Sequence, residues 1–208
     1  MSEPRSSEPR LTLLRAADRK PSPWKNGGGA TTEIAVSPMG ASLESFDWRV
    51  SMARVESDGP FSVFPGIDRY CAVLAGALSL RVGDAKPVDL DATSQPFEFP
   101  GDVPTHAQMQ QGPVEDLNVF ARRGRVMASI ECVSWSGSIT RRVHSDTCLV
   151  LLRSFGAAIA CGTSKLEGLI FDDVVRLDKA ADTVINLSAG EAAVAYVVRL
   201  TMCHPPPP

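Results

Sequence analysis

The sequence is poor in residues that bind metals. It contains three histidines, His106, His144 and His204, and they lie far apart in the chain. None of them forms an H-x-H pair, an H-E-x-x-H motif or a two-histidine, one-carboxylate cluster with its sequence neighbours. These are the spacings typical of zinc, iron or manganese sites. We therefore expect neither a metal nor another cofactor.

Long runs of one kind of residue are also absent. No block of five or six like charges occurs, and the formal net charge is −3, which argues against a nucleic-acid partner. The longest apolar stretches, such as residues 149–152, are far shorter than the roughly 18 residues of a membrane span. Residues 1–5 do not lead into the apolar core of a signal peptide. We expect a cytoplasmic protein with no membrane partner.

Motifs for covalent chemistry are missing as well. The five cysteines are odd in number, scattered, and form no C-x-x-C pair, so neither a disulfide framework nor a zinc knuckle is indicated. No G-x-S-x-G nucleophile elbow occurs, and no serine or cysteine lies in a recognisable nucleophile setting beside a histidine. The sequence therefore offers no hydrolase triad.

What the sequence does contain is many short apolar segments. Stretches with the 3.6-residue period of a helix are scarce, and runs rich in Val, Ile, Leu and Phe are separated by Gly, Pro, Asp or Ser. Close spacing of so many short strands predicts an all-β sandwich or barrel. The expected strands are residues 31–36, 47–55, 70–74, 77–82, 97–99, 117–121, 148–153, 157–161, 169–171, 174–177, 183–187 and 192–201.

An internal similarity points to two related halves. Residues 70–80 resemble residues 147–160. The resemblance is explained either by two copies of one small β unit or by chance similarity between apolar hairpins. The segment Trp135-Ser136-Gly137-Ser138 reads as the connector between the halves.

The most unusual segment is Trp24-Lys25-Asn26-Gly27-Gly28-Gly29. Three successive glycines either let a loop turn sharply or bring backbone N–H groups close to an anion. The segment is not a Walker A loop, because the lysine precedes the glycines and no G-K-[ST] follows. The residues alone leave the structural loop and the ligand loop equally open.

Three of the expected strands carry a polar face. Side chains alternate along a strand, so the pairs that share a face are Thr31 with Glu33, Arg49 with Ser51, and Asp116 with Asn118. Such faces are either wet exteriors or the lining of a lumen, and periodicity alone does not separate the two.

Four sequence blocks, in order, resemble the HutD/Ves family. The blocks are Trp24-Lys25-Asn26-Gly-Gly-Gly-x-Thr31-x-Glu33-Ile34, Phe46-x-Trp48-Arg49-x-Ser51-x-Ala53, Gly59-Pro60-Phe61-Ser62-x-Phe64-Pro65-Gly66-x-x-Arg69, and Asp116-Leu117-Asn118. The resemblance is specific from about residue 11 to residue 121 and looser to residue 200.

The resemblance implies a cupin-superfamily (RmlC-like) protein with two jelly-roll β-barrels in one chain, a bicupin. We expect an N-terminal barrel over residues 11–135 and a C-terminal barrel over residues 136–203. Flexible ends are expected over residues 1–10 and 204–208. The histidine positions of metal-binding cupins fall around Phe64, Pro65 and Gly66, and Arg69 lies near the glutamate position. A metal-free barrel is therefore expected.

In such a barrel the polar strand faces become candidates for the lumen. A buried arginine needs a partner, so Arg49 and Arg69 should meet Glu33, Asp116 or an anionic ligand. Arginine binds carboxylates through a bidentate fork, while Lys25, Asn26 and the glycine backbone would close the mouth. The expected ligand-binding residues are Lys25, Asn26, Thr31, Glu33, Arg49, Ser51, Phe64, Arg69, Asp116 and Asn118.

The resemblance further implies a metal-free protein that binds a small acidic metabolite, such as N-formylglutamate or urocanate, and moderates histidine utilisation. Without a nucleic-acid surface it would act by sequestering the ligand or through a protein partner, and it could form a homodimer.

Two alternatives remain open. One is a metal-free isomerase or epimerase with Glu33 or Asp116 as base and Arg49 stabilising negative charge. The other is a structural dimerisation module without ligand.

Overall fold

The computed structural model describes residues 9–203 and consists almost entirely of β-strands. The only helical segment in that range is one turn of 3-10 helix, η1 (Ala16–Asp18). None of the described residues form a helix long and apolar enough to cross a lipid bilayer. The expectation of an all-β fold is confirmed.

The chain divides into two compact units. The larger unit contains Arg19–Ile130 and Cys203, and the smaller unit contains Glu131–Met202 together with residues 9–18. The N-terminal strand thus belongs to the same unit as the C-terminal half of the sequence.

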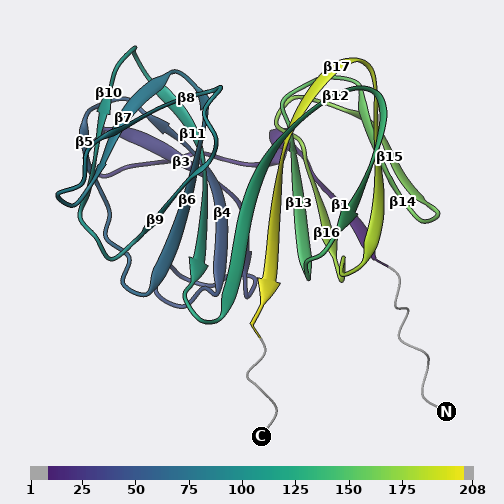
Figure 1. Cartoon of the computed structure of the whole chain (residues 1–208), viewed down its shortest axis with the longest axis horizontal. Helices are drawn as coiled ribbons and strands as arrows, with labels where there is room; N and C mark the ends of the chain where they lie inside the picture. Colours follow the sequence, from purple (N-terminus) through teal and green to yellow (C-terminus); the bar gives the residue numbers. More distant parts are fainter. Residues whose placement is uncertain (1–8, 204–208) are drawn as a thin grey trace, which may run out of the picture. The chain divides into compact units, whose positions relative to one another are not determined.

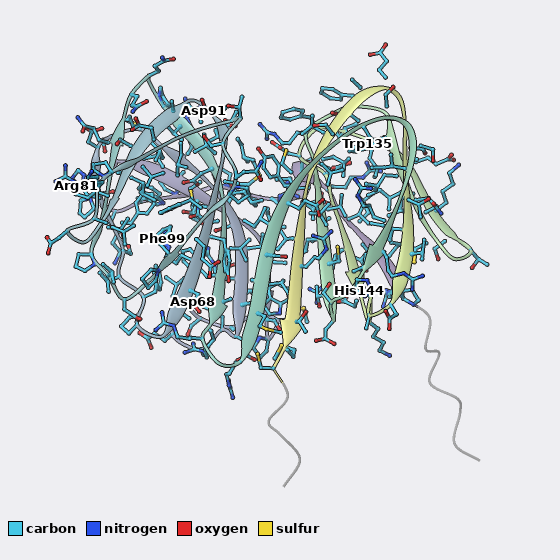
Figure 2. All side chains as sticks on the ribbon, in the orientation of Figure 1. Asp68, Arg81, Asp91, Phe99, Trp135 and His144 are labelled. Carbon is cyan, nitrogen blue, oxygen red and sulfur yellow. The ribbon has the colours of Figure 1, made fainter. Side chains whose placement is uncertain are left out.

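The larger unit contains two antiparallel sheets (Figure 1). The six-stranded sheet has the order β2 (Ser22–Pro23), β3 (Gly29–Ser37), β4 (Trp48–Val55), β11 (Val114–Arg122), β6 (Ile67–Ala75) and β9 (Phe97–Pro100). The four-stranded sheet has the order β5 (Gly59–Phe61), β10 (Thr105–Met109), β7 (Ala77–Val82) and β8 (Val88–Asp91). Residues of both sheets, such as Val73, Leu80 and Phe99, share one buried apolar cluster, so the sheets close around a common interior. Phe99 is labelled in Figure 2.

The smaller unit is built on one seven-stranded sheet. Six strands follow the order β1 (Arg10–Leu14), β16 (Val174–Asp178), β13 (Thr147–Leu152), β17 (Thr183–Met202), β14 (Ala157–Cys161) and β15 (Ser164–Leu169), and β12 (Val126–Val143) pairs with β17. The long strand β17 pairs with β14 through its first part and with β13 through its second. The interior is filled by buried side chains, including Trp135 (Figure 2), Val150 and Leu177.

The two units share one pattern of strand pairing. The path β4-β11-β6-β9 of the larger unit corresponds to β12-β17-β13-β16 of the smaller unit, and β10-β7-β8 corresponds to β17-β14-β15. The single strand β17 therefore takes the places that β10 and β11 occupy separately. The internal similarity in the sequence falls on equivalent hairpins, because residues 70–80 cover β6 and β7 and residues 147–160 reach from β13 into β14.

Six strands, β1, β2, β5, β8, β10 and β12, were not predicted, and three other expectations were wrong. Residues 169–171 are not a strand, because β15 ends at Leu169 and Phe171 lies in a turn. The expected connector around Gly137 lies inside β12, where pairing with β17 carries the strand past a glycine at φ 70°. Residues 183–187 and 192–201 form one strand instead of two. In the last two cases pairing with neighbouring strands outweighed the local composition.

The expected domain boundaries also differ from the structure. Residues 11–18 were assigned to the N-terminal barrel, whereas β1 pairs with β16 and residues up to Asp18 belong to the smaller unit. The division between the units falls after Ile130, within β12, instead of at residue 135. Of the ends expected to be flexible, residues 1–8 and 204–208 lie outside the described residues, and Arg10 already belongs to β1.

Asp173 secures the segment that follows β1, and its replacement should destabilise the smaller unit. Its side chain is fully buried and accepts hydrogen bonds from Arg15 Nη1 at 2.9 Å, Ala16 N at 3.0 Å and Ile170 N at 3.2 Å. Asp173→Ala leaves these donors without their acceptor, and we expect a loss of about 3 kcal/mol in the free energy of unfolding. Asp173→Asn keeps one acceptor oxygen and should lose less. Urea unfolding measures the free energy of unfolding of both variants. Two variants as stable as the wild type would contradict the stabilising role of Asp173.

Candidate functional site

The larger unit contains a cavity of about 610 Å³ between its two sheets. The strand β4 contributes Arg49, Ser51, Ala53 and Val55 to the walls, and β11 contributes Asp116, Asn118 and Phe120. Each of these sets has the spacing of two that places side chains on one face of a strand. Pro60 and Phe61 of β5 line the cavity from the other sheet. The polar faces of β4 and β11 are therefore interior surfaces and not wet exteriors.

The structure brings nine of the ten expected ligand-binding residues to this cavity. They are Lys25, Asn26, Thr31, Arg49, Ser51, Phe64, Arg69, Asp116 and Asn118. Glu33 is the exception: it does not line the cavity, and its side chain is 48% exposed. Glu33 is still in register with Ser51, before the bulge in β3, but its Oε2 accepts a hydrogen bond from Arg49 Nε at 2.8 Å. Glu33 therefore orients Arg49 from outside the cavity.

Arg69 on β6 is the most deeply buried cation of the site. It is 5% exposed, and its guanidinium carbon lies 4.6 Å from the ring centre of Phe120, 4.9 Å from those of Phe61 and Phe99, and 5.9 Å from that of Phe64. These aromatic faces stabilise the cation in place of water. Burial lowers the pKa of Arg69 to about 10, so the guanidinium keeps its charge near neutral pH.

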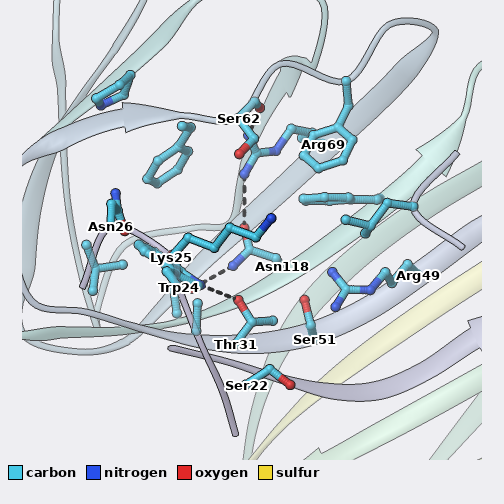
Figure 3. A pocket seen from close by; sticks show the side chains of 18 of the residues that line it. Ser22, Trp24, Lys25, Asn26, Thr31, Arg49, Ser51, Ser62, Arg69 and Asn118 are labelled. Atoms are coloured by element: carbon cyan, nitrogen blue, oxygen red, sulfur yellow. Dashed lines mark hydrogen bonds between the residues drawn. The ribbon is translucent and has the colours of Figure 1, made fainter. Parts of the chain in front are cut away.

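The hydrogen bonds of Arg69 are incomplete. Nη1 donates to the carbonyl oxygen of Ser62 at 3.2 Å, and Nη2 donates to Asn118 Oδ1 over a long 3.5 Å (Figure 3). The buried Nε has no hydrogen-bond partner among the described residues. No carboxylate within residues 9–203 forms an ion pair with Arg69 that would offset its desolvation. A buried cation in this condition has unused capacity for an anion.

Asp116 lies beside Arg69 without bonding to it. Its carboxyl is 1% exposed, Oδ1 accepts from Asn118 Nδ2 at 2.6 Å, and the Cys71 thiol lies 3.8 Å from Oδ2. Asn118 therefore separates the two charged groups, with its amide oxygen toward Arg69 and its amide nitrogen toward Asp116. Burial raises the pKa of Asp116 to about 6, although the charge of Arg69 acts in the opposite direction.

Positive charge dominates the cavity. Lys25, Arg49 and Arg69 approach it from the loop after β2, from β4 and from β6, and their charged ends point into the same space (Figure 3). Asp116 is the only carboxyl among the lining residues. The arrangement favours an anionic occupant.

The glycine segment is a structural turn that carries Lys25. Gly27 N donates to Trp24 O at 3.0 Å and Gly28 N donates to Asn26 Oδ1 at 3.1 Å, so these amides are already used within the loop. None of the three glycines lines the cavity, which corrects the expectation that their backbone closes its mouth. The loop contributes side chains instead, and Trp24 Nε1 fixes it to Thr31 Oγ1 at 2.8 Å.

Sequence reasoning predicted Phe64 but missed the other three aromatic residues around Arg69, which are Phe61, Phe99 and Phe120. Phe120 follows Asp116 and Asn118 at the same spacing of two, so alternation could have placed it on the same face. Phe61 belongs to one of the blocks that resemble HutD/Ves, next to Ser62. Nothing in the sequence signals that Phe99 of β9 contacts Arg69, because that contact depends on the pairing of β9 with β6.

The residues at this site do not fit the metal centre of a cupin. No group of three histidine, cysteine or carboxylate side chains that could hold a metal occurs in the described part of the chain. His106 is an exposed residue of β10 and does not line the cavity. A guanidinium, an amide and aromatic rings occupy the interior, and none of these is a typical ligand of a transition metal.

Comparison with known proteins identifies the family. The HutD family model matches residues 16–195. The chain belongs to the HutD family. An uncharacterised 21.2 kDa protein encoded in the hutC 3′ region of Pseudomonas putida is 32% identical over 170 residues, which are 81% of this chain and 87% of that protein. The protein Ves of Citrobacter koseri is 35% identical over 108 residues, 51% of this chain and 56% of Ves.

Solved structures of similar proteins agree with the family assignment and show the fold of this HutD-family chain. A conserved protein of unknown function from Pseudomonas aeruginosa has a TM-score of 0.85 at 32% identity, covering 92% of this chain and 99% of that one. HutD from Pseudomonas fluorescens (formate condition) has a TM-score of 0.78 at 29% identity, covering 93% and 99%. Bacillus subtilis oxalate decarboxylase shares the fold alone, with a TM-score of 0.66 at 11% identity over 90% of this chain and 76% of that one. The fold is all-β, barrel-like and cupin-like.

Replacing Asp116 by Asn should change how stability depends on pH. Because the pKa of Asp116 is raised from 3.8 to about 6, the folded protein holds this proton more tightly than the unfolded chain. The stability that Asp116 contributes is complete below about pH 4 and is lost as pH rises through about 6. Relative to wild type, the free energy of unfolding of Asp116→Asn should therefore rise by about 1 kcal/mol between pH 5 and pH 8. Urea unfolding at both pH values measures the difference. The exposed Asp84→Asn is the control, and equal pH dependence of all three proteins would contradict the expectation.

Gly29 is required by the geometry of the loop that presents Lys25. It has φ 155°, and a Cβ atom there would lie 2.2 Å from the carbonyl oxygen of Arg54. We expect Gly29→Ala to cost at least about 3 kcal/mol of unfolding free energy, from backbone strain and this clash. Gly27 also has a positive φ but leaves open space for a Cβ, so Gly27→Ala should cost only about 1 kcal/mol. If thermal or urea unfolding shows that both variants lose the same unfolding free energy, the close approach of Gly29 to Arg54 is not what requires a glycine there.

Proposed function

We propose that this HutD-family protein binds a small acidic metabolite in the cavity of the larger unit. It does so without a metal, acts in the cytoplasm and moderates histidine utilisation. The observation that carries the proposal is the burial of Arg69 among four aromatic rings with no ion-paired carboxylate in the described chain and an unpaired Nε. A ligand carboxylate would supply the missing acceptor and the missing negative charge.

Size and polarity of the cavity suit such a ligand. A volume of about 610 Å³ is within the range of small-molecule sites, which are mostly apolar with a few convergent polar groups. Here the polar groups are Arg69 and Asn118 in the interior, with Arg49 and Lys25 as further cations. N-formylglutamate and urocanate both carry a carboxylate and are the candidates that the family name favours.

The names of relatives support the link to histidine utilisation. One relative is encoded in the hutC 3′ region of Pseudomonas putida, and a solved structure of similar fold is HutD from Pseudomonas fluorescens. The protein would moderate the pathway by sequestering an intermediate or by signalling its level to a protein partner. We place a second copy of this chain among its partners, and neither nucleic acid nor membrane.

We further propose that each unit is a cupin-like jelly-roll barrel, so that the chain is a bicupin. The matching order of strand pairing in the two units supports this proposal. The two barrels would then differ in function, because side chains such as Trp135 fill the interior of the smaller unit while the larger unit keeps a polar cavity. Ligand binding belongs to the larger unit.

A metal-free isomerase or epimerase is the second candidate. The raised pKa of Asp116, about 6, suits a group that exchanges protons near neutral pH, and Arg69 could stabilise negative charge beside it. Glu33 does not suit the role of base, because it lies outside the cavity and pairs with Arg49. Turnover of a bound acid that disappears in Asp116→Asn would favour this candidate.

A thermal-shift screen with small acids tests the binding proposal. N-formylglutamate and urocanate should raise the melting temperature, since a ligand that binds only the native state stabilises it, and their amides should not. Arg69→Met keeps an apolar side chain among the rings while removing the charge, so it should fold with stability close to wild type. It should bind the acids at least tenfold more weakly by calorimetry.

The matched control is Arg81→Ala, which removes an exposed arginine of β7 that does not line the cavity. This variant should bind like the wild type. A folded Arg69→Met variant with unchanged affinity would exclude Arg69 as the carboxylate partner, and no stabilisation by any acid would favour a structural module.

A further inference from the structure

Asp116 holds an unusual position for a carboxyl group at an anion site. It lines the same cavity as Arg69 and is 1% exposed. Among the described residues its side-chain partners are the Asn118 amide and the Cys71 thiol, and the Ala53 backbone also hydrogen-bonds to it. An ion pair between Asp116 and Arg69 would close the site to other anions. Asn118 prevents that pair by bonding to both groups.

The charged and titratable groups around Asp116 come from three elements. Arg69 and Cys71 face it from β6, Arg49 lines the same cavity from β4, and Lys25 reaches the cavity from the loop after β2. Burial raises the pKa of the Cys71 thiol well above its ordinary range, so this neighbour is neutral. Arg69 is therefore the main support for a negative charge on Asp116.

An anion bound to Arg69 would remove that support. The ligand carboxylate neutralises the guanidinium and places a second negative charge near Asp116 in a poorly solvated cavity. Two carboxylates that share such a site do not both stay ionised, and the proton affinity of one rises. The one that can take up a proton here is Asp116, because the ligand carboxylate bonds directly to the cation.

We propose that the binding of a carboxylate ligand to Arg69 is coupled to the uptake of one proton from solvent by Asp116. The inference rests on the proposed function, since it describes how the same cavity accepts its ligand. The proton converts the Asp116 carboxylate into a neutral carboxylic acid, which adds an O–H donor to the cavity wall. No other bond forms or breaks. Ligand affinity then reports the cellular pH as well as the ligand concentration.

The coupling predicts a definite pH profile for affinity. The pKa of Asp116 is about 6 in the free protein, and bound ligand raises it further. Between these two values the dissociation constant increases by up to tenfold for each pH unit. For N-formylglutamate we expect binding to weaken at least fivefold between pH 6 and pH 8. Calorimetry in buffers of different ionisation enthalpy should show net proton uptake at pH 7.

Asp116→Asn is the decisive variant. It keeps the size and the acceptor oxygen of the side chain but cannot ionise, so its affinity for N-formylglutamate should not change with pH. At pH 8 it should bind at least as tightly as the wild type, and its binding should take up no proton. Asp84→Asn, at an exposed carboxylate of the turn after β7, is the matched control and should keep the wild-type profile.

A titration of the ligand-free protein tests the proton coupling separately from the proposed ligand binding. Carbon-13 NMR of the aspartate carboxyls, with Asp116→Asn to assign the signal, should show Asp116 titrating near pH 6 and higher when N-formylglutamate is added. Wild-type binding with the same affinity at pH 6 and pH 8 would overturn the coupling and leave the proposed function standing. Failure of both N-formylglutamate and urocanate to bind at any pH would overturn both. An Asp116 that titrates at its ordinary pH in the free protein would overturn the coupling alone.

Discussion

The character of the cavity in the larger unit depends on the burial of the Arg69 guanidinium among aromatic rings. Removing a cation from water costs several kcal/mol, and an ion pair usually offsets part of that cost. Here Phe61, Phe64, Phe99 and Phe120 supply the stabilisation, together with two hydrogen bonds. Within residues 9–203 the Arg69 guanidinium is therefore buried without an ion-paired carboxylate, and the proposed ligand would supply one.

The surrounding fold serves to hold this group in place. The strands β4, β11 and β6 lie side by side, so residues at matching register present a continuous polar surface: Ser51 pairs with Asn118, and Asn118 pairs with Cys71. The β5 segment covers Arg69 from the second sheet through Phe61, and the glycine turn places Lys25 beside the cavity. The smaller unit repeats the same strand pairing around an apolar interior, which shows that the architecture does not require a cavity.

The sequence predicted the residues of the site more accurately than it predicted the strand boundaries, because side-chain alternation is local and strand pairing is not. Alternation along β4 and β11 is a local property, so Arg49, Ser51, Asp116 and Asn118 could be assigned to one face without a structure. Position relative to other strands is not local. The ion pair between Glu33 and Arg49, which holds Glu33 outside the cavity, depends on the pairing of β3 with β4. The continuation of β12 through Gly137 and the docking of β1 on β16 likewise depend on partners far away in the sequence.

In the proposed function the cavity is a carboxylate site centred on Arg69. The most direct test is a crystal structure of the protein with N-formylglutamate at saturating concentration, at a pH near 6. We expect a ligand carboxylate oxygen within hydrogen-bond distance of the Arg69 guanidinium and the rest of the ligand against the aromatic rings around Arg69. A cavity that holds only water, or a ligand whose carboxylates lie away from Arg69, would contradict it.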